Sequence, residues 1–365
     1  MARTKDEGAG VKAPARLMDA IVSRIRQNEG EDSSIITDAV AGATDYISTQ
    51  SLALDMALNM PGIPVGRLTV VRGWESSGKS TLITHLVAET LQRGGLAMLL
   101  DSEFAFDEER AKRIGVDMDG EFLLMQPPTV EKAIALIESS IKEIRQDTPD
   151  ALVLVVWDSV GGTPTQAQIE NEFGESEARG QHARIISSAL RRITGLVAKE
   201  NIALVIVNQN KELNIDGAPF RSSENSTMLA RHPLQFHAST IIDMRKGSEL
   251  VLGDKTKPDA EAYGIIAKAK ITKNKCSNPF GKCEIRVLFD TGFDDTYAHF
   301  QAALRIGMIQ KKGTWYQMAG VDKAFHEGDF ESILDSQDGL LDRIALAARE
   351  QLWSETVKSR FLSGG

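Results

Sequence analysis

The chain is poor in the features that mark secreted and membrane proteins. Its only cysteines among 365 residues are Cys276 and Cys283, which are too few for a disulfide scaffold and lack the spacing of a metal site. The longest apolar run, Ala151–Trp157, is much shorter than the roughly 18 residues that a membrane helix needs. The charged N-terminus is followed by no apolar core or small-residue cleavage site, so a secretory signal is not expected. These absences predict a soluble cytoplasmic protein with no membrane partner.

The chain also lacks an excess of positive charge, since 42 Lys and Arg stand against 51 Asp and Glu. A surface that is basic all over is therefore excluded, but nucleic-acid binding depends on local clusters. Two such clusters exist: Arg179–Arg192 contains no acidic residue, and Lys268–Arg286 contains Glu284 alone. Either cluster taken alone could equally be a solvated face. The apolar share of 42 % and the charged share of 25 % are those of an ordinary globular protein.

Apolar, β-branched segments alternate with helical patterns through the middle of the chain. The expected strands are Leu68–Val71, Ala97–Leu100, Leu152–Val156 and Ala203–Val207. The expected helices are Thr81–Arg93, Val130–Arg145 and Gln181–Glu200. This alternation predicts an α/β fold with a mainly parallel, twisted sheet flanked by helices.

The flanks of this region have a different character. Residues 1–34 read as a polar segment with one short helix at Ala15–Arg26, where leucine and isoleucine recur every four residues. Ala260–Phe289 is rich in strand-forming residues, with a turn at Pro279–Gly281. Short helical segments then dominate. We therefore predict an N-terminal segment at 1–34, a core at 35–292 and a small C-terminal α/β domain at 293–365.

A phosphate-binding loop is predicted at Gly73–Ser80, where GWESSGKS fits the pattern GxxxxGK[ST] between an apolar strand and an apolar helix. Glycines let backbone N–H groups close around phosphate oxygens, and the helix N-terminus adds its positive dipole. Lys79, expected as an ammonium on a surface loop, would reach the β and γ phosphates, and Ser80 could ligate Mg²⁺. The residues expected around the nucleotide are Gly73, Trp74, Glu75, Ser76, Ser77, Gly78, Lys79, Ser80 and Thr81.

Polar side chains follow the other predicted strands. Asp158 follows the third strand and could hold Mg²⁺ through its water shell. The second strand ends in Asp101–Glu103, where a carboxylate could polarise water for attack on the γ-phosphate, or could only cap a helix or lie in solvent. An amide in Asn208–Gln209 could sense the γ-phosphate. Together with the phosphate loop, these positions predict hydrolysis of a nucleoside triphosphate.

Several ordered blocks resemble those of bacterial and phage RecA recombinases. They are GWESSGKSTL, LLDSEFAFDEERAKRIGVD, VVWDSV, IENEFGESEARGQHAR, VIVNQN, KITKNKCSNPFG and, more weakly, GMIQKKGTWYQMAG. The resemblance covers about Ile47 to Gly292 and is more specific than a phosphate loop. It implies a RecA-like core and an ATPase that forms a filament on single-stranded DNA, pairs it with homologous double-stranded DNA and exchanges strands. The location would be the cytoplasm, or the host cytoplasm for a phage protein.

Carried over by motif, the resemblance assigns roles at the ATP and Mg²⁺ site. Glu103 would be the hydrolytic carboxylate, and Asp158 the Mg²⁺-associated acid. Gln209 would couple the γ-phosphate to a DNA-binding loop. Asp107 would lie near the adenine. Arg110 stands where bacterial members usually carry an aromatic residue, and its guanidinium could also stack on the base.

The resemblance also implies contacts beyond one subunit. Lys273 and Lys275 would reach the ATP of the neighbouring subunit, so that ATP lies at the interface of a homo-oligomeric helical filament. Two DNA-binding loops would correspond to about 168–180 and 210–231, and they would follow the phosphate backbone without reading sequence. The cations expected at DNA are Arg179, Arg184, Lys211, Arg221 and Arg231.

The second DNA loop departs from the family pattern. It closes with Leu229–Pro233, where the family usually has a pair of glycines, so its conformation stays open, as does a phosphate-binding or solvated role for Arg231. This departure motivates an alternative function, an ATP-binding recombination mediator or filament cap without strand exchange of its own. A ring helicase would share the ATPase core, but we do not expect it to combine the KNK and IENEFGE blocks. Strand exchange is the main prediction, because the expected catalytic residues are intact.

Overall fold

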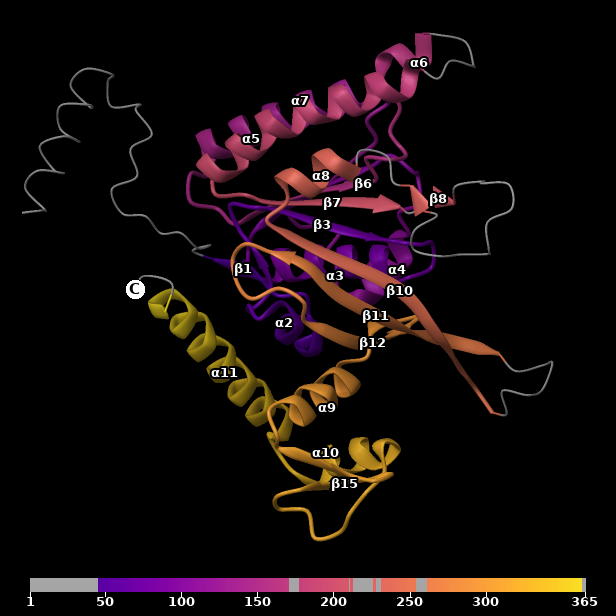
Figure 1. Ribbon diagram of the computed structural model, residues 1–365, viewed down its shortest axis with the longest axis vertical. Coiled ribbons are helices and arrows are strands. Elements are labelled where there is room, and N and C mark those ends of the chain that lie inside the picture. Colours follow the sequence, from indigo (N-terminus) through magenta and orange to yellow (C-terminus); the bar gives the residue numbers. More distant parts are fainter. Residues whose placement is uncertain are drawn as a thin grey trace, which may run out of the picture. The chain divides into compact units, whose positions relative to one another are not determined.

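A nine-stranded sheet organises the part of the chain that this computed structural model describes, residues 45–170, 177–209, 211–212, 226–227, 231–253 and 261–362. The strand order is β13-β12-β11-β10-β3-β7-β6-β4-β5 (Figure 1). The parallel strands are β10 (Thr240–Val251), β3 (Leu68–Gly73), β7 (Ala203–Gln209), β6 (Val153–Asp158), β4 (Leu96–Asp101) and β5 (Phe122–Met125). The mainly parallel sheet predicted from the sequence is confirmed.

An antiparallel extension continues the sheet beyond β10. It consists of β11 (Ala262–Asn274), β12 (Lys282–Leu288) and β13 (Gly292–Phe293). The turn predicted at Pro279–Gly281 joins β11 to β12. Short antiparallel pairs lie outside the main sheet, among them β1 (Tyr46–Ile47) with β2 (Ile63–Pro64), and β8 (Lys211–Glu212) with β9 (Ser226–Thr227).

Helices cover both faces of the sheet. Successive residues of a strand point to opposite faces, so neighbouring residues pack against different helices. Val71 belongs to a core cluster shared with α2 (Leu52–Leu58), α3 (Lys79–Gln92) and α4 (Glu108–Ile114). Val70 belongs to a second cluster, which contains residues of α5 (Val130–Asp147), α7 (Glu177–Lys199) and α8 (Arg231–His237). Figure 1 shows α5, α7 and α8 together on one side of the strands. The central strands β3, β7, β6 and β4 are therefore buried on both faces, as their continuous apolar sequences predict.

Helix α8 is an element that the sequence analysis missed. It begins at Arg231, inside the segment expected to close the second DNA loop, and it contains Pro233. Proline is tolerated in the first turn of a helix, because the N–H that it lacks has no intrahelical acceptor there. Leu234 then packs into the core cluster of α5 and α7. Side-chain packing thus decides the conformation at a position where the local pattern suggested only a constrained loop.

The C-terminal elements have a hydrophobic cluster of their own. They are α9 (Asp295–Arg305), β14 (Ile309–Lys312), β15 (Trp315–Met318), the 3₁₀ turn η1 (Glu327–Asp329), α10 (Phe330–Ser336) and α11 (Leu340–Leu362). Phe300, Tyr316 and Phe330 lie at the centre of this cluster, and Met56 of α2 joins it. The limits 35–292 and 293–365 stay predictions, and the predicted segment 1–34 lies outside the described residues. None of the described helices is long and apolar enough to cross a membrane.

Candidate active site

The predicted phosphate loop joins the end of β3 to the start of α3. Its glycines are needed because neighbouring backbone lies too close for a side chain at Gly73 and because φ is positive at Gly78. A Cβ atom on Gly73 would lie 2.1 Å from the carbonyl oxygen of Met244 on the neighbouring strand β10. Gly78, the N-cap of α3, has a φ of +89°, which L side chains rarely adopt. Within the loop Trp74 is half-buried, Ser77 is buried, and Glu75 and Ser76 are exposed. The backbone of the loop and the N-terminus of α3 therefore face the same point in space.

Lys79 lies inside this loop rather than on the surface. Its side chain is 6 % exposed, and its Nζ donates to the carbonyl oxygen of Trp74 at 2.7 Å, which also accepts from Ser77 Oγ at 2.7 Å. Burial lowers the pKa of Lys79, while the carboxylates of Asp158, Glu103 and Glu75 raise it. The expectation of a surface-loop ammonium is wrong. A desolvated cation of this kind gains from an anionic ligand that replaces the carbonyl.

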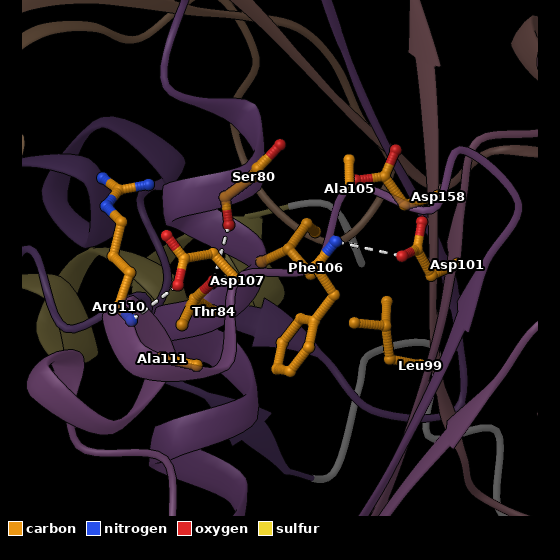
Figure 2. A pocket seen from close by; sticks show the side chains of 11 residues that line it. Ser80, Thr84, Leu99, Asp101, Ala105, Phe106, Asp107, Arg110, Ala111 and Asp158 are labelled. Atoms are coloured by element: carbon orange, nitrogen blue, oxygen red, sulfur yellow. Dashed lines mark hydrogen bonds between the residues drawn. The ribbon is translucent and has the colours of Figure 1, made fainter.

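Two carboxylates meet where β4 and β6 end, because Asp101 and Asp158 are paired in register. The pKa of Asp158 is raised to about 7, chiefly by burial and also by the charge of Glu103, while the charge of Lys79 acts in the opposite direction. Asp101 orders the chain after β4, since its carboxylate accepts from the N–H groups of Glu103 at 3.1 Å and Phe106 at 3.0 Å (Figure 2). Asp101 therefore has a structural task at this site, and it lines the same pocket as Asp158.

Asp158 and Ser80 fit a magnesium ion. Both line one pocket together with Asp101, Asp107 and Arg110 (Figure 2). Magnesium prefers one or two protein oxygens and completes its shell with water and substrate phosphates. A buried carboxylate with a raised pKa is stabilised as the anion by a nearby cation. No group of three or more His, Cys, Asp or Glu side chains that could hold a metal occurs in the described part of the chain.

Glu103 is held from two sides. Its Oε1 accepts a short hydrogen bond from Ser159 Oγ, and its Oε2 accepts from Gln209 Nε2 at 2.5 Å. Ser159 follows β6, and Gln209 is the last residue of β7, so the bonds fix the carboxylate across the carboxyl ends of neighbouring strands. The sequence pattern points to Glu103 and Gln209 but not to Ser159. The signal that could have found it is its position directly after Asp158, at the edge where the parallel strands end.

Asp107 and Arg110, the residues expected near a base, lie at the start of α4. Asp107 caps this helix, and its Oδ1 accepts from the N–H of Arg110 at 2.9 Å. The guanidinium of Arg110 donates to Thr81 Oγ1 at 2.8 Å and to the carbonyl oxygen of Phe289 at 3.0 Å. Burial lowers the pKa of Arg110. Figure 2 shows the guanidinium directed away from Asp101 and Asp158. Stacking of this guanidinium on a base stays a prediction.

Lys273 and Lys275 lie far along the sheet from the phosphate loop of their own chain. The register pairs Lys273 with Ile241 and Ile241 with Val70, whereas Gly73 pairs with Met244. Lys273 is therefore level with the middle of β3, three residues before Gly73, and Lys275 lies nearer the start of that strand, since its N–H donates to the carbonyl oxygen of Ser239. Lys273 Nζ donates to the carbonyl oxygens of Gln235 at 2.6 Å and Phe236 at 3.2 Å in α8, and Lys275 is exposed. The structure does not bring these two cations to the phosphate loop within one chain.

The expected DNA-binding cations are described to different extents. Arg184 is exposed on α7. Arg179 in α7, Lys211 in β8 and Arg231 in α8 belong to described elements, but their side chains lie outside the description. Arg221 lies outside the described residues altogether. Arg184 is thus the one of these five cations whose side chain the structure describes, and it is exposed to solvent.

Comparison with known proteins gives one consistent family. Residues 16–294 match the family described as the RecA N-terminal domain. The Protein RecA of Acidothermus cellulolyticus is 33 % identical over 338 residues, which cover 92 % of this chain and 93 % of that protein. The Protein RecA of Syntrophus aciditrophicus is 33 % identical over 343 residues, 93 % and 94 % of the two chains. That of Helicobacter pylori is 34 % identical over 312 residues, 85 % and 84 % of the two chains.

Proposed function

The chain belongs to the RecA family, and on that basis we propose that it is a DNA-dependent ATPase that assembles on single-stranded DNA and exchanges strands with a homologous duplex. Family membership assigns it broadly to homologous recombination and DNA repair. The observation that carries the finer proposal is the convergence of Lys79, Asp158 and Glu103 at one phosphate loop, close enough for each carboxylate to raise the pKa of Lys79.

ATP would bind with its phosphates in the loop that follows β3. The backbone N–H groups of this loop and the dipole of α3 favour an anion. Lys79 would exchange the carbonyl oxygen of Trp74 for the β and γ phosphates, because a charge-assisted hydrogen bond is stronger than one to a neutral carbonyl. Magnesium, held by Ser80 and Asp158, would neutralise charge on those phosphates. The surroundings of Lys79 thus support a role for its ammonium in binding phosphate rather than in transferring a proton.

Glu103 would polarise the attacking water. Its two oxygens are held by Ser159 and Gln209, so the carboxylate is oriented before a substrate arrives. A positioned acid or base contributes about 10²–10⁴-fold to a rate. The bonds to Ser159 and Gln209 therefore support Glu103, rather than Asp101, as the hydrolytic carboxylate.

Gln209 would report the nucleotide state to DNA. It ends β7, directly before the segment expected to form the second DNA loop, and its amide donates to Glu103. A γ-phosphate next to Glu103 would compete for that N–H. The exchange of one acceptor for the other would shift Gln209, and the loop attached to it would follow.

Lys273 and Lys275 would act on the ATP of the neighbouring subunit. Their position on the far side of β10 from β3, away from their own phosphate loop, supports action in trans. Such a site is complete only where two subunits meet, so hydrolysis would depend on assembly of a homo-oligomeric filament. Arg184, exposed on α7, would contact the phosphate backbone of DNA.

The test measures ATP hydrolysis with and without single-stranded DNA, together with strand pairing on homologous and heterologous duplexes. We expect DNA-stimulated hydrolysis and pairing on the homologous duplex alone, with Lys79→Ala as the inactive control. Stimulated hydrolysis without pairing on either duplex would favour the alternative function, a recombination mediator or filament cap, which the sequence departure at Leu229–Pro233 motivates. Unwinding of a duplex without pairing would indicate a helicase. A rate of ATP hydrolysis that single-stranded DNA does not change would contradict the proposal.

A further inference from the structure

A buried series of polar contacts connects Glu103 to helix α7. The hydroxyl of Ser159 donates to Glu103, and the carbonyl oxygen of Ser159 accepts from Thr163 Oγ1 at 2.8 Å. The carbonyl oxygen of Thr163 in turn accepts from His182 Nε2 on α7 at 3.2 Å. Ser159 and Thr163 are 1 % exposed and His182 is 2 % exposed. Water is excluded from all three residues, so a displacement of one is passed to the next.

The turn between β6 and α6 (Gln166–Glu170) lies directly against Glu103. A Cβ atom on Gly162 would lie 3.1 Å from Glu103 Cγ and 3.2 Å from Ser159 Oγ, and the N–H of Gly162 donates to Ser159 Oγ at 3.1 Å. Thr163 Oγ1 also accepts from Trp157 Nε1 at 3.0 Å and lies 2.7 Å from Ser102 Oγ. The turn, here residues 159–163, is therefore tied to both strands that carry the site.

A histidine at position 182 lowers the stability of the fold relative to an apolar residue of the same size. The acceptor is a carbonyl, so Nε2 must carry the proton, and Nδ1 keeps only its lone pair. Nδ1 is buried and has no hydrogen-bond partner among the residues that the structure describes. An unsatisfied buried polar atom costs about 1–3 kcal/mol. A leucine would fill the same space without this cost, so the bond to Thr163 is what the imidazole provides.

The opposite face of α7 carries the exposed cation. Arg184 follows His182 by two residues, which places it about 200° further around the helix. His182 accordingly points into the core and Arg184 into solvent. A ligand that fixes Arg184 would fix the same helical turn that holds His182. The helix thus offers a rigid connection between the surface and the turn at 159–163.

We propose that His182 is a positioning residue that couples DNA on α7 to the hydrolytic carboxylate. This inference rests on the proposed function, DNA-dependent ATP hydrolysis. DNA held by Arg184 fixes the helical turn of α7 that carries His182, and His182 holds the turn at 159–163 through Thr163. Ser159 then keeps Glu103 in the orientation that polarises water. Without the bond from His182, the turn and Ser159 would no longer follow the position of α7.

The test compares His182→Leu, which keeps volume but removes the bond, with His182→Gln, whose Nε2 can reach the same carbonyl. The readout is the ratio of ATP turnover with saturating single-stranded DNA to turnover without DNA. Because removal of one coupling interaction is expected to change an equilibrium by roughly three- to thirtyfold, the ratio should fall by about tenfold in His182→Leu. It should recover in His182→Gln. Ser188→Ala, on the exposed face of α7, is the matched control and should leave the ratio unchanged.

A merely structural histidine would behave differently. Equal loss of both turnover rates in His182→Leu, an unchanged ratio, or failure of His182→Gln to recover would each overturn the inference. If His182→Leu does not fold, His182→Asn, whose amide is too short to reach Thr163, gives the same comparison. Wild-type protein without DNA stimulation would overturn the proposed function and this inference with it. Wild-type stimulation that persists unchanged in His182→Leu would overturn the inference alone.

Discussion

Charged side chains are buried in one region of the sheet and exposed in another. At the carboxyl ends of β3, β4 and β6, Lys79 is buried, and burial raises the pKa of Asp158 to about 7. On the antiparallel extension, Lys268, Lys270 and Lys275 are exposed. Buried charges are tolerated only when they are paired or when a ligand pairs them, whereas exposed cations need no partner to be stable. The first region therefore holds desolvated charges that a ligand could pair, and the second holds solvated cations.

We therefore expect the two regions to contribute to different steps of the proposed activity. Removing a group from the buried edge should affect hydrolysis inside every subunit. Removing a cation from the extension should affect only processes that need a neighbour or DNA. The following experiments test that division, in order of decreasing effect.

Lys79→Ala should have the strongest effect on turnover. The buried ammonium is the group that would meet the phosphates, and loss of a phosphate-stabilising cation costs about 10³–10⁵-fold in turnover. We expect ATP hydrolysis to fall by about 10⁴-fold while the circular dichroism spectrum and thermal midpoint show a folded protein. Normal turnover in this variant would refute the assignment of the phosphate loop.

Glu103→Gln should retain binding and lose chemistry. The amide keeps the shape of the side chain but cannot draw a proton from water, so hydrolysis should fall by about 10³-fold. ATP should still bind, because the phosphate loop and Asp158 are untouched, and assemblies on single-stranded DNA should last longer. Glu108→Gln is the matched control, since Glu108 is exposed and pairs with Lys112 on α4. If Glu103→Gln hydrolyses ATP normally, the catalytic carboxylate lies elsewhere, and Asp101 is the next candidate.

The double variant Lys273→Ala/Lys275→Ala tests the extension. It should reduce hydrolysis by about tenfold or more, because each phosphate loop would lose the cations of its neighbour. Mixed with Lys79→Ala in equal amounts, it should regain activity, since roughly a quarter of the interfaces would join an intact loop to intact lysines in a random assembly. Recovery is measured as turnover against mixing ratio. No recovery at any ratio, with co-assembly demonstrated, would show that the site is not shared between subunits.

Arg184→Ala should have the weakest effect of the four. We expect single-stranded DNA to bind about five- to tenfold more weakly, and the slope of log affinity against log salt to fall by about 0.7 for each phosphate that the protein no longer neutralises. Arg192→Ala is the matched control, because Arg192 is exposed on the same helix but pairs with Glu138 at 2.7 Å. Equal losses of affinity in the two variants would contradict a specific role for Arg184. Binding would be measured by fluorescence anisotropy across a salt series with mixed-sequence strands.

The elements that the sequence predicts well are those with local causes. Val130–Arg145 has an apolar stripe at helical spacing, and α5 spans Val130–Asp147 with Thr129 as its cap. The phosphate loop is recognisable because its glycines meet a local demand for close approach and positive φ. Helix α8 was missed because Leu234 owes its place to packing against α5 and α7. No pattern within that segment contains this information.

The arrangement of the site was predicted only in part. Glu103 and Gln209 were named separately, but they are 106 residues apart and meet through the order of the strands. Ser159, which is 56 residues from Glu103, was not named. Lys79 was expected on a surface loop and is buried, because β10 closes against the loop at Gly73. Each of these facts depends on which strands become neighbours.

Residue pattern alone accounts for the parallel strands, the phosphate loop and the residue types at the carboxyl ends of the strands. These follow from apolar spacing, from glycine geometry and from polar side chains that end apolar runs, all of which act within a few residues. Tertiary packing was needed to establish that Glu103 is held by Ser159 and Gln209, that Lys273 lies away from its own phosphate loop, and that His182 contacts Thr163. The physical reason is that hydrogen bonding and desolvation act between atoms close in space, and the packing of the sheet and its helices sets that closeness.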